Sequence, residues 1–191
     1  IEQVFRDVSK VTFVNHKESN WSFSKEELIS YAKEIGIFSN GGSQQYETYY
    51  NCKLSNFLNA VLIHPTTMPI DETANRRYKY EVCDFIADNN MYFVKIGSPS
   101  NFAYAVDQAS LTLSKLQSGN GKIKLPDDNE ISPQEFHLVL VCEGRKTMIE
   151  KWSDVYSINF LIHIVDLKQS LNNMNIALIV DFVYDKTSIN V

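Results

Sequence analysis

The chain has 191 residues, 44% of them hydrophobic and 12% aromatic, so it can bury a full core and is not intrinsically disordered. The sequence contains no apolar run near the roughly eighteen residues of a transmembrane helix, and no secretory signal pattern, which indicates a cytoplasmic protein without a membrane span. A net charge of −5 argues against a domain that coats nucleic acid by charge alone, while a local basic groove stays compatible with it.

The length predicts a single α/β domain over residues 1–191, and the start at Ile1 rather than Met predicts that the chain is a piece of a larger protein. Three cysteines, Cys52, Cys83 and Cys142, form no C-x-x-C pair and are odd in number. This spacing argues against a disulfide framework or a zinc knuckle, and we expect buried thiols in a reducing compartment.

The first third of the chain contains one helix with clear boundaries. Residues 4–13 fit either a strand or a short helix. Ser24 and Glu27 form a capping box, and apolar residues then recur at helical spacing until Gly36. Residues 46–63 form a second apolar segment, whose end fits a strand or a buried helix.

The middle of the chain predicts a β-hairpin. Residues 78–86 alternate as a strand does, residues 91–96 form a second short apolar run, and Ala87 to Asn90 supply turn residues between them. The elements expected after the hairpin are a helix over 101–117, a strand over 136–142, a helix over 155–173 and a strand over 176–184. Residues 65–77 and 118–133 carry the composition of extended loops.

This order predicts an α/β fold. Strands separated by helices near the C-terminus run parallel, while the hairpin strands are antiparallel. We therefore expect a mixed central sheet with an antiparallel hairpin, parallel C-terminal strands and helices on both faces.

The hairpin also brings two charged side chains together. With a loop of two or four residues, Asp84 lies opposite Phe93 and Val82 lies opposite Lys95. Asp84 and Lys95 then become diagonal neighbours on one face, where a carboxylate can hold a divalent cation beside an ammonium group that contacts a phosphate. Glu81 points to the other side unless a bulge interrupts the pairing.

This arrangement resembles the PD-(D/E)XK, or restriction-endonuclease-like, superfamily, in which an Asp on one hairpin strand and an acidic-x-Lys motif on the next bind Mg²⁺ for phosphodiester hydrolysis. The element order is similar as well. The resemblance implies a nuclease that acts on DNA with Mg²⁺, with Asp84 as metal ligand, Lys95 orienting the attacking water and Gln108, on the following helix, supporting the site.

One position departs from the motif, because Phe93 stands where the family has the acid two residues before the lysine. A metal used for hydrolysis needs several carboxylate oxygens, so another acid must complete the site. Asp107 and Glu34 are candidates. Without such an acid, the chain is a degenerate relative that retains DNA binding.

The hairpin region is also similar to a sporadically distributed bacterial family of unknown function that occurs near mobile elements and defence genes. The matching residues are Glu81 to Asp84, Val94 with Lys95, and Gln108. The resemblance covers about forty residues. It implies a role in defence against phage or plasmids.

A different interpretation takes Asp84 and Lys95 as an ordinary surface ion pair across two strands. The chain is then a non-catalytic domain that binds a protein partner, or a second copy of itself, within a larger assembly. Four histidines, His16, His64, His137 and His163, show no ligand-pair spacing, so we expect none of them to bind metal.

Overall fold

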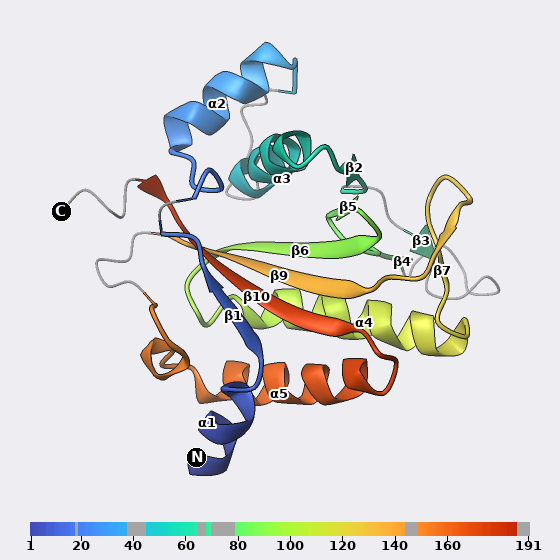
Figure 1. The fold of residues 1–191 in the computed structure, drawn as a ribbon. Coiled ribbons are helices and arrows are strands. Elements are labelled where there is room, and N and C mark those ends of the chain that lie inside the picture. The colour runs from blue at the N-terminus through green and yellow to red at the C-terminus, as the bar shows by residue number, and fades with distance from the viewer. Residues whose placement is uncertain (18, 38–44, 65–67, 70–78, 144–148, 187–191) are drawn as a thin grey trace.

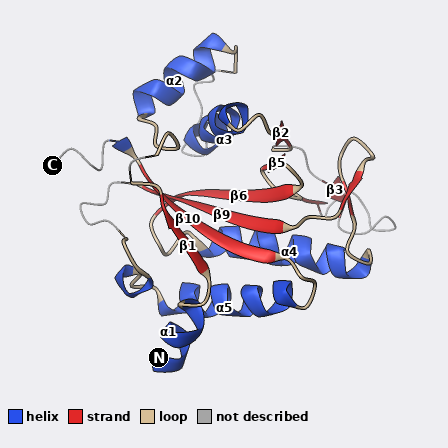
Figure 2. Ribbon diagram, viewed as in Figure 1, coloured by secondary structure: helices blue, strands red, loops and turns tan. Residues whose placement is uncertain are grey.

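A computed structural model of the chain describes residues 1–17, 19–37, 45–64, 68–69, 79–143 and 149–186 (Figure 1). The helices are α1 Glu2–Val8, α2 Lys25–Glu34, α3 Gln45–Phe57, α4 Ala103–Ser118 and α5 Ile158–Asn172, with a 3₁₀ turn at Trp152–Asp154. The strands are β1 Thr12–Asn15, β2 Val61–Leu62, β3 Met68–Pro69, β4 Lys79–Tyr80, β5 Phe85–Ala87, β6 Asn90–Gly97, β7 Ile123–Lys124, β8 Glu130–Ile131, β9 Glu135–Cys142 and β10 Ala177–Tyr184. Figure 2 shows the longer strands at the centre of the molecule, with helices above and below them.

A six-stranded mixed sheet, in the order β1-β10-β9-β6-β5-β2, forms the centre of the molecule. Strands β1, β10, β9 and β6 run parallel to one another, whereas β5 pairs antiparallel with β6 and with β2. This confirms the predicted α/β fold class, with an antiparallel hairpin joined to parallel C-terminal strands. Helices lie on both faces of the sheet, α4 and α5 on one and α2 and α3 on the other (Figure 1).

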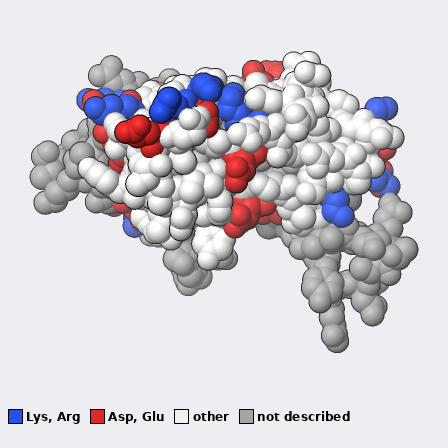
Figure 3. Space-filling view, turned by 90° about the horizontal axis from the view of Figure 1, so that it is seen from below, with Lys and Arg blue, Asp and Glu red and all other residues white. Residues whose placement is uncertain are grey.

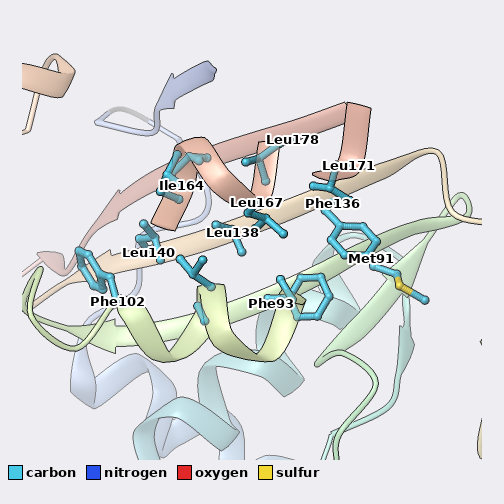
Figure 4. Close-up of a cluster of buried hydrophobic side chains, with 14 of the residues drawn as sticks. Met91, Phe93, Phe102, Phe136, Leu138, Leu140, Ile164, Leu167, Leu171 and Leu178 are labelled. Carbon is cyan, nitrogen blue, oxygen red and sulfur yellow. The ribbon is translucent and has the colours of Figure 1, made fainter. Parts of the chain in front are cut away.

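The larger part of the core lies between the sheet and the α4/α5 layer. Strand residues that point to this side, such as Phe93, Phe136 and Leu138, meet helix residues such as Leu167 and Leu171 (Figure 4). All five are at most 2% exposed. The Phe93 ring centroid lies 5.0 Å from that of Phe136. Phe93, which stands where the motif has an acid, therefore belongs to the core.

A second core cluster lies on the opposite face, under α2 and α3. It combines Tyr49, Tyr50 and Leu54 of α3 with Phe85 and Val94 of the hairpin. Because successive strand residues point to opposite faces, β6 supplies Phe93 to one cluster and Val94 to the other. The hairpin is therefore packed on both sides and does not lie on the surface.

Helix α2 begins with the predicted capping box. The Ser24 hydroxyl accepts a hydrogen bond from the Glu27 backbone N–H at 3.1 Å, and the Glu27 carboxylate accepts one from the Ser24 backbone N–H at 2.7 Å. Gly36 follows the helix with φ of +76°, a conformation that glycine adopts at little cost. The predicted start and end of this helix are thus confirmed.

We expect Ser24→Ala to destabilise the protein by about 1 kcal/mol, because it removes the side-chain acceptor for a helix N–H that has no intrahelical partner. Chemical denaturation followed by circular dichroism measures this change. Ser24→Asp, which keeps an acceptor at the same position, is the matched control and should stay within about 0.5 kcal/mol of the wild type. Equal loss of stability in both variants would contradict the capping role.

Two segments differ from the sequence-based expectation. The first 15 residues contain both of the structures considered for residues 4–13, helix α1 followed by strand β1. The segment 118–133, expected as a loop, contains the short antiparallel pair β7 and β8, whereas most of the loop expected over 65–77 lies outside the described residues. Among the helices that the structure describes, none has the length and apolar character needed to cross a membrane.

Candidate metal centre

The hairpin pairs Phe85 with Tyr92, Ile86 with Met91 and Ala87 with Asn90, around a two-residue loop. The loop residues Asp88 and Asn89 have φ of +50° and +63°, as a type I′ turn requires. This is the predicted register. The ladder ends at Phe85, however, so the strand is shorter than the sequence pattern indicated.

Asp84 lies directly before the ladder, where the chain bends. Its Oδ2 accepts a hydrogen bond from the Val94 backbone N–H at 2.7 Å, and its Oδ1 accepts one from Asn51 Nδ2 at 2.7 Å. Its carbonyl accepts the backbone N–H groups of Ile63 and His64, both at 2.9 Å. The carboxylate thus takes the place of a missing strand partner for β6, and at 2% exposure it is not part of a surface ion pair.

The bend at Asp84 also brings Glu81 into the site. Residues 81–84 form no strand, so the alternation that would send Glu81 to the other side does not apply. Glu81 Oε1 lies 2.6 Å from His64 Nδ1, which is itself 3.6 Å from Asp84 Oδ1. The pairing is interrupted here, which is the exception under which Glu81 was not expected to point away, and Glu81 supplies the second carboxylate.

Helix α3 provides the polar side chains that surround this cluster. Thr48 Oγ1 lies 3.1 Å from His64 Nε2, and Asn51, one turn from Glu47, donates to Asp84. Glu47 Oε2 accepts the Ile96 backbone N–H at 3.2 Å. Two carboxylates, those of Asp84 and Glu47, therefore accept the N–H groups of Val94 and Ile96, two residues apart on the part of β6 that β5 does not reach.

Lys95 makes its ion pair with Glu47, at 3.0 Å, and not with Asp84 as its diagonal position suggested. It lies near the end of β6, where its long side chain can reach α3. Gln108 on α4 donates to Glu81 Oε2 at 3.4 Å, so it contacts the cluster through Glu81. Lys95 and Gln108 thus each contact a glutamate near Asp84, Lys95 contacting Glu47 and Gln108 contacting Glu81.

The other acids considered from the sequence do not join the cluster. Asp107 lines a cavity of about 310 Å³ between α4 and α5, together with His163 and Asp166. Figure 3 shows that outer face, with Asp and Glu among uncharged side chains in the middle and Lys and Arg mainly toward one edge. Glu34 is exposed at the end of α2.

His64, Glu81 and Asp84 have the geometry of a metal site, since one ligand atom of each lies within 4.8 Å of the others. His64 Nδ1 and Glu81 Oε1 are both buried and lie 2.6 Å apart, so these two atoms partner each other. Among the described residues, the buried Asn51 Oδ1 has no hydrogen-bond partner. An unpaired amide oxygen beside these three side chains fits an additional oxygen ligand for a cation.

Burial raises the pKa of Asp84 to about 7, although the Val94 N–H acts in the opposite direction. Contact with the Glu81 carboxylate raises the pKa of His64 against the effect of burial. A protonated His64 therefore balances the negative charge of the cluster when no metal is bound. A divalent cation would replace that proton, because imidazole and carboxylate ligands bind metal in their deprotonated forms.

Sequence reasoning did not find Glu47 or His64. Spacing gives no sign of His64, which enters the site from the segment after β2. A signal for α3 was present, because Glu47, Asn51 and Ser55 recur every four residues along a helix that also carries buried aromatic residues. The chain matches no known family model, no curated protein and no solved structure.

Proposed function

We propose that this chain is a metal-dependent nuclease-like domain that hydrolyses DNA phosphodiester bonds. The observation that carries the proposal is the cluster of His64, Glu81 and Asp84, whose ligand atoms lie within 4.8 Å of one another. Glu81 and His64 supply the donors that Phe93 cannot, so the departure from the acidic-x-Lys motif does not leave a one-carboxylate site. The proposed role in bacterial defence or on a mobile element rests on the resemblance of the hairpin region.

The donor set helps to choose the metal. Carboxylate oxygens suit Mg²⁺ and Mn²⁺, whereas an imidazole nitrogen favours a transition metal. Mn²⁺ is therefore expected to bind more tightly than the Mg²⁺ that the resemblance implies. A metal bound here would supply Lewis-acid polarisation of the phosphate and a more acidic water.

The surrounding residues have separate roles in this proposal. Asn51 and the Val94 N–H orient Asp84, and Gln108 orients Glu81. Lys95, held at 3.0 Å by Glu47, places an ammonium group where it can neutralise a phosphate oxygen. Asn51 and Gln108 are positioning residues that affect the rate through the ligands, whereas Lys95 acts on the substrate itself.

A cleavage assay on labelled single-stranded and duplex DNA, with Mn²⁺ or Mg²⁺, tests the proposal. We expect Asp84→Asn and Glu81→Gln each to lower the cleavage rate about 100-fold or more, because each removes a ligand charge from the metal. Asp107→Asn is the matched control, since it removes a carboxylate outside the cluster. Its rate should equal that of the wild type.

Cleavage that is unaffected by Asp84→Asn would show that the activity comes from elsewhere. Absence of both metal-dependent cleavage and Mn²⁺ binding in the wild type would overturn the proposal. Mn²⁺ binding without cleavage would instead support the degenerate relative, in which the site binds DNA and metal but does not turn over.

One observation favours a non-catalytic protein-binding function as the second candidate. Phe57, Val61 and Leu62, at the end of α3 and on the edge strand β2, are 52%, 60% and 39% exposed. An exposed apolar sheet edge is a common contact surface for another chain. Sedimentation of the wild type and Val61→Lys would show whether this edge joins two copies or binds a protein partner.

A further inference from the structure

A cavity of about 690 Å³ lies at the end of β6 that follows Lys95, beside the start of α4. This volume falls in the range of small-ligand sites. Glu47 and Lys95 line it, so the cavity is directly connected to the ion pair that neighbours the candidate metal centre. The proposed function does not by itself assign this space an occupant.

Two tyrosines and two lysines from different elements line the cavity. Tyr104, in the first turn of α4, is 67% exposed, and Tyr46 reaches the same space from α3. Lys95 Nζ lies 5.9 Å from the centre of the Tyr104 ring, and Lys25 Nζ lies 5.0 Å from the centre of the Tyr46 ring. An aromatic plane next to a cation is the combination that holds a nucleobase and its phosphate.

The two lysines differ in how firmly each is paired with a carboxylate. Lys25 lies 2.7 Å from Glu143, and both side chains are more than 40% exposed. Ion pairs with this exposure contribute little stability, so Lys25 can exchange the carboxylate for a phosphate at small cost. Lys95 is more enclosed. It lines the cavity and is paired with Glu47, which lines the cavity as well.

We infer that this cavity binds one unpaired nucleotide of a single-stranded DNA, with its base against Tyr104 or Tyr46 and its phosphate between Lys95 and Lys25. The inference rests on the proposed function, since it places the substrate strand beside the metal ligands. A base can stack on a tyrosine only when its face is free of neighbouring bases, which favours single strands over duplex. The net charge of −5 argues in the same direction, because duplex binding depends on many phosphate contacts.

The test measures binding without metal, in EDTA, so that it does not depend on cleavage. A single-stranded oligonucleotide with one 2-aminopurine reports stacking by fluorescence quenching and affinity by titration. We expect the wild type to quench the probe and Tyr104→Leu to weaken its binding about 10-fold or more, whereas Tyr104→Phe keeps the aromatic plane and binds normally. Tyr156→Leu, which removes another exposed tyrosine outside the cavity, should bind like the wild type.

The outcomes separate the two proposals. If Asp84→Asn abolishes cleavage while Tyr104→Leu and Tyr46→Leu bind the probe as the wild type does, the nucleotide site is wrong and the nuclease proposal stands. If the tyrosines control quenching but no metal-dependent cleavage occurs, the nucleotide site stands without the nuclease. Equal affinity of the wild type for a blunt duplex, or tighter binding of an RNA strand of the same sequence, would overturn the assignment to single-stranded DNA.

Discussion

Replacing Asp84 with Asn is expected to abolish Mn²⁺ binding while leaving the metal-free protein at least as stable as the wild type at pH 8. Burial takes the Asp84 carboxylate out of water, and the nearby His64 offsets only part of the resulting cost. Asp84 is 2% exposed, and burial raises its pKa to about 7. The ionised form of Asp84 therefore weakens the fold when no metal is bound.

The sign of this effect follows from proton linkage. Between about pH 4 and pH 7, folded Asp84 holds a proton that the unfolded chain has released, so the free energy of unfolding falls as pH rises. Above pH 7 the group is ionised in both states, and its burial costs roughly 2–4 kcal/mol. Asp84→Asn removes this pH-dependent loss of stability.

The substituted amide can also keep the local hydrogen bonds. Its oxygen can accept the Val94 N–H that now binds Asp84 Oδ2. Its nitrogen can donate to Asn51 Oδ1, which has no partner among the residues described in the wild type, once the Asn51 amide rotates. The substitution should thus leave the bend before β5 intact.

Thermal unfolding with and without Mn²⁺ measures both effects. At a metal concentration about 100 times Kd, the wild type gains about 2.7 kcal/mol, which raises Tm by roughly 5–10 °C. Asp84→Asn should show no shift, and Asp107→Asn should shift as the wild type does. A Mn²⁺ shift of equal size in Asp84→Asn would contradict the metal centre.

The hairpin illustrates how far sequence reasoning reaches for this chain. Alternating residues and the turn Asp88–Asn89 predict the pairing of Phe85 with Tyr92 correctly, because register depends on local turn chemistry. The same reasoning extended the strand through Glu81 and placed that side chain on the other side of the sheet unless a bulge interrupted the pairing, as the break at residues 81–84 does. The segment leaves the ladder because the Asp84 side chain, not its backbone, pairs with Val94. The alternation of residues along a strand gives no sign that a side chain will take over a backbone hydrogen bond.

The assembly of the site depends on tertiary packing, which explains the residues that were missed. Glu47 and His64 come from α3 and from the segment after β2, and they approach the hairpin only because α3 packs across β5 and β6. By contrast, Gln108 was anticipated from its place on the helix after the hairpin, and it does contact Glu81. Its contact agrees with the resemblance, whereas its role in catalysis stays a prediction.

Asp181→Ala is expected to cost the protein roughly 3–5 kcal/mol, because Asp181 is a buried carboxylate between two histidines. Its Oδ1 lies 2.7 Å from His16 Nε2 and its Oδ2 lies 2.8 Å from His137 Nδ1. The rings are packed as well, His16 on Trp21 at 4.1 Å and His137 on Tyr92 at 4.4 Å between centroids. Removing the carboxylate leaves two enclosed imidazoles without their acceptor.

The pH dependence gives this prediction a signature that general loss of packing would not produce. Burial alone would lower the pKa of His137, but contacts with Asp181 and Glu135 outweigh it and raise the pKa. The stability that His137 contributes is complete below about pH 6.5 and is lost as pH rises through its raised pKa.

Burial alone would raise the pKa of Asp181, but the histidines outweigh it and lower the pKa. That contribution is complete above about pH 4 and is lost as pH falls further.

The difference in free energy of unfolding between wild type and Asp181→Ala should therefore be largest between about pH 4 and pH 6.5 and shrink on both sides. Urea denaturation from pH 4 to pH 9 measures it, and the effect of Asp84 cancels because both proteins contain that residue. Asp166→Ala, which removes an exposed carboxylate from α5, should change stability by less than about 0.5 kcal/mol at every pH. A difference that stays constant from pH 5 to pH 9 would show that His137 does not exchange its proton in this range. The cost of removing Asp181 would then reflect its hydrogen bonds and packing, without a contribution from protonation of His137.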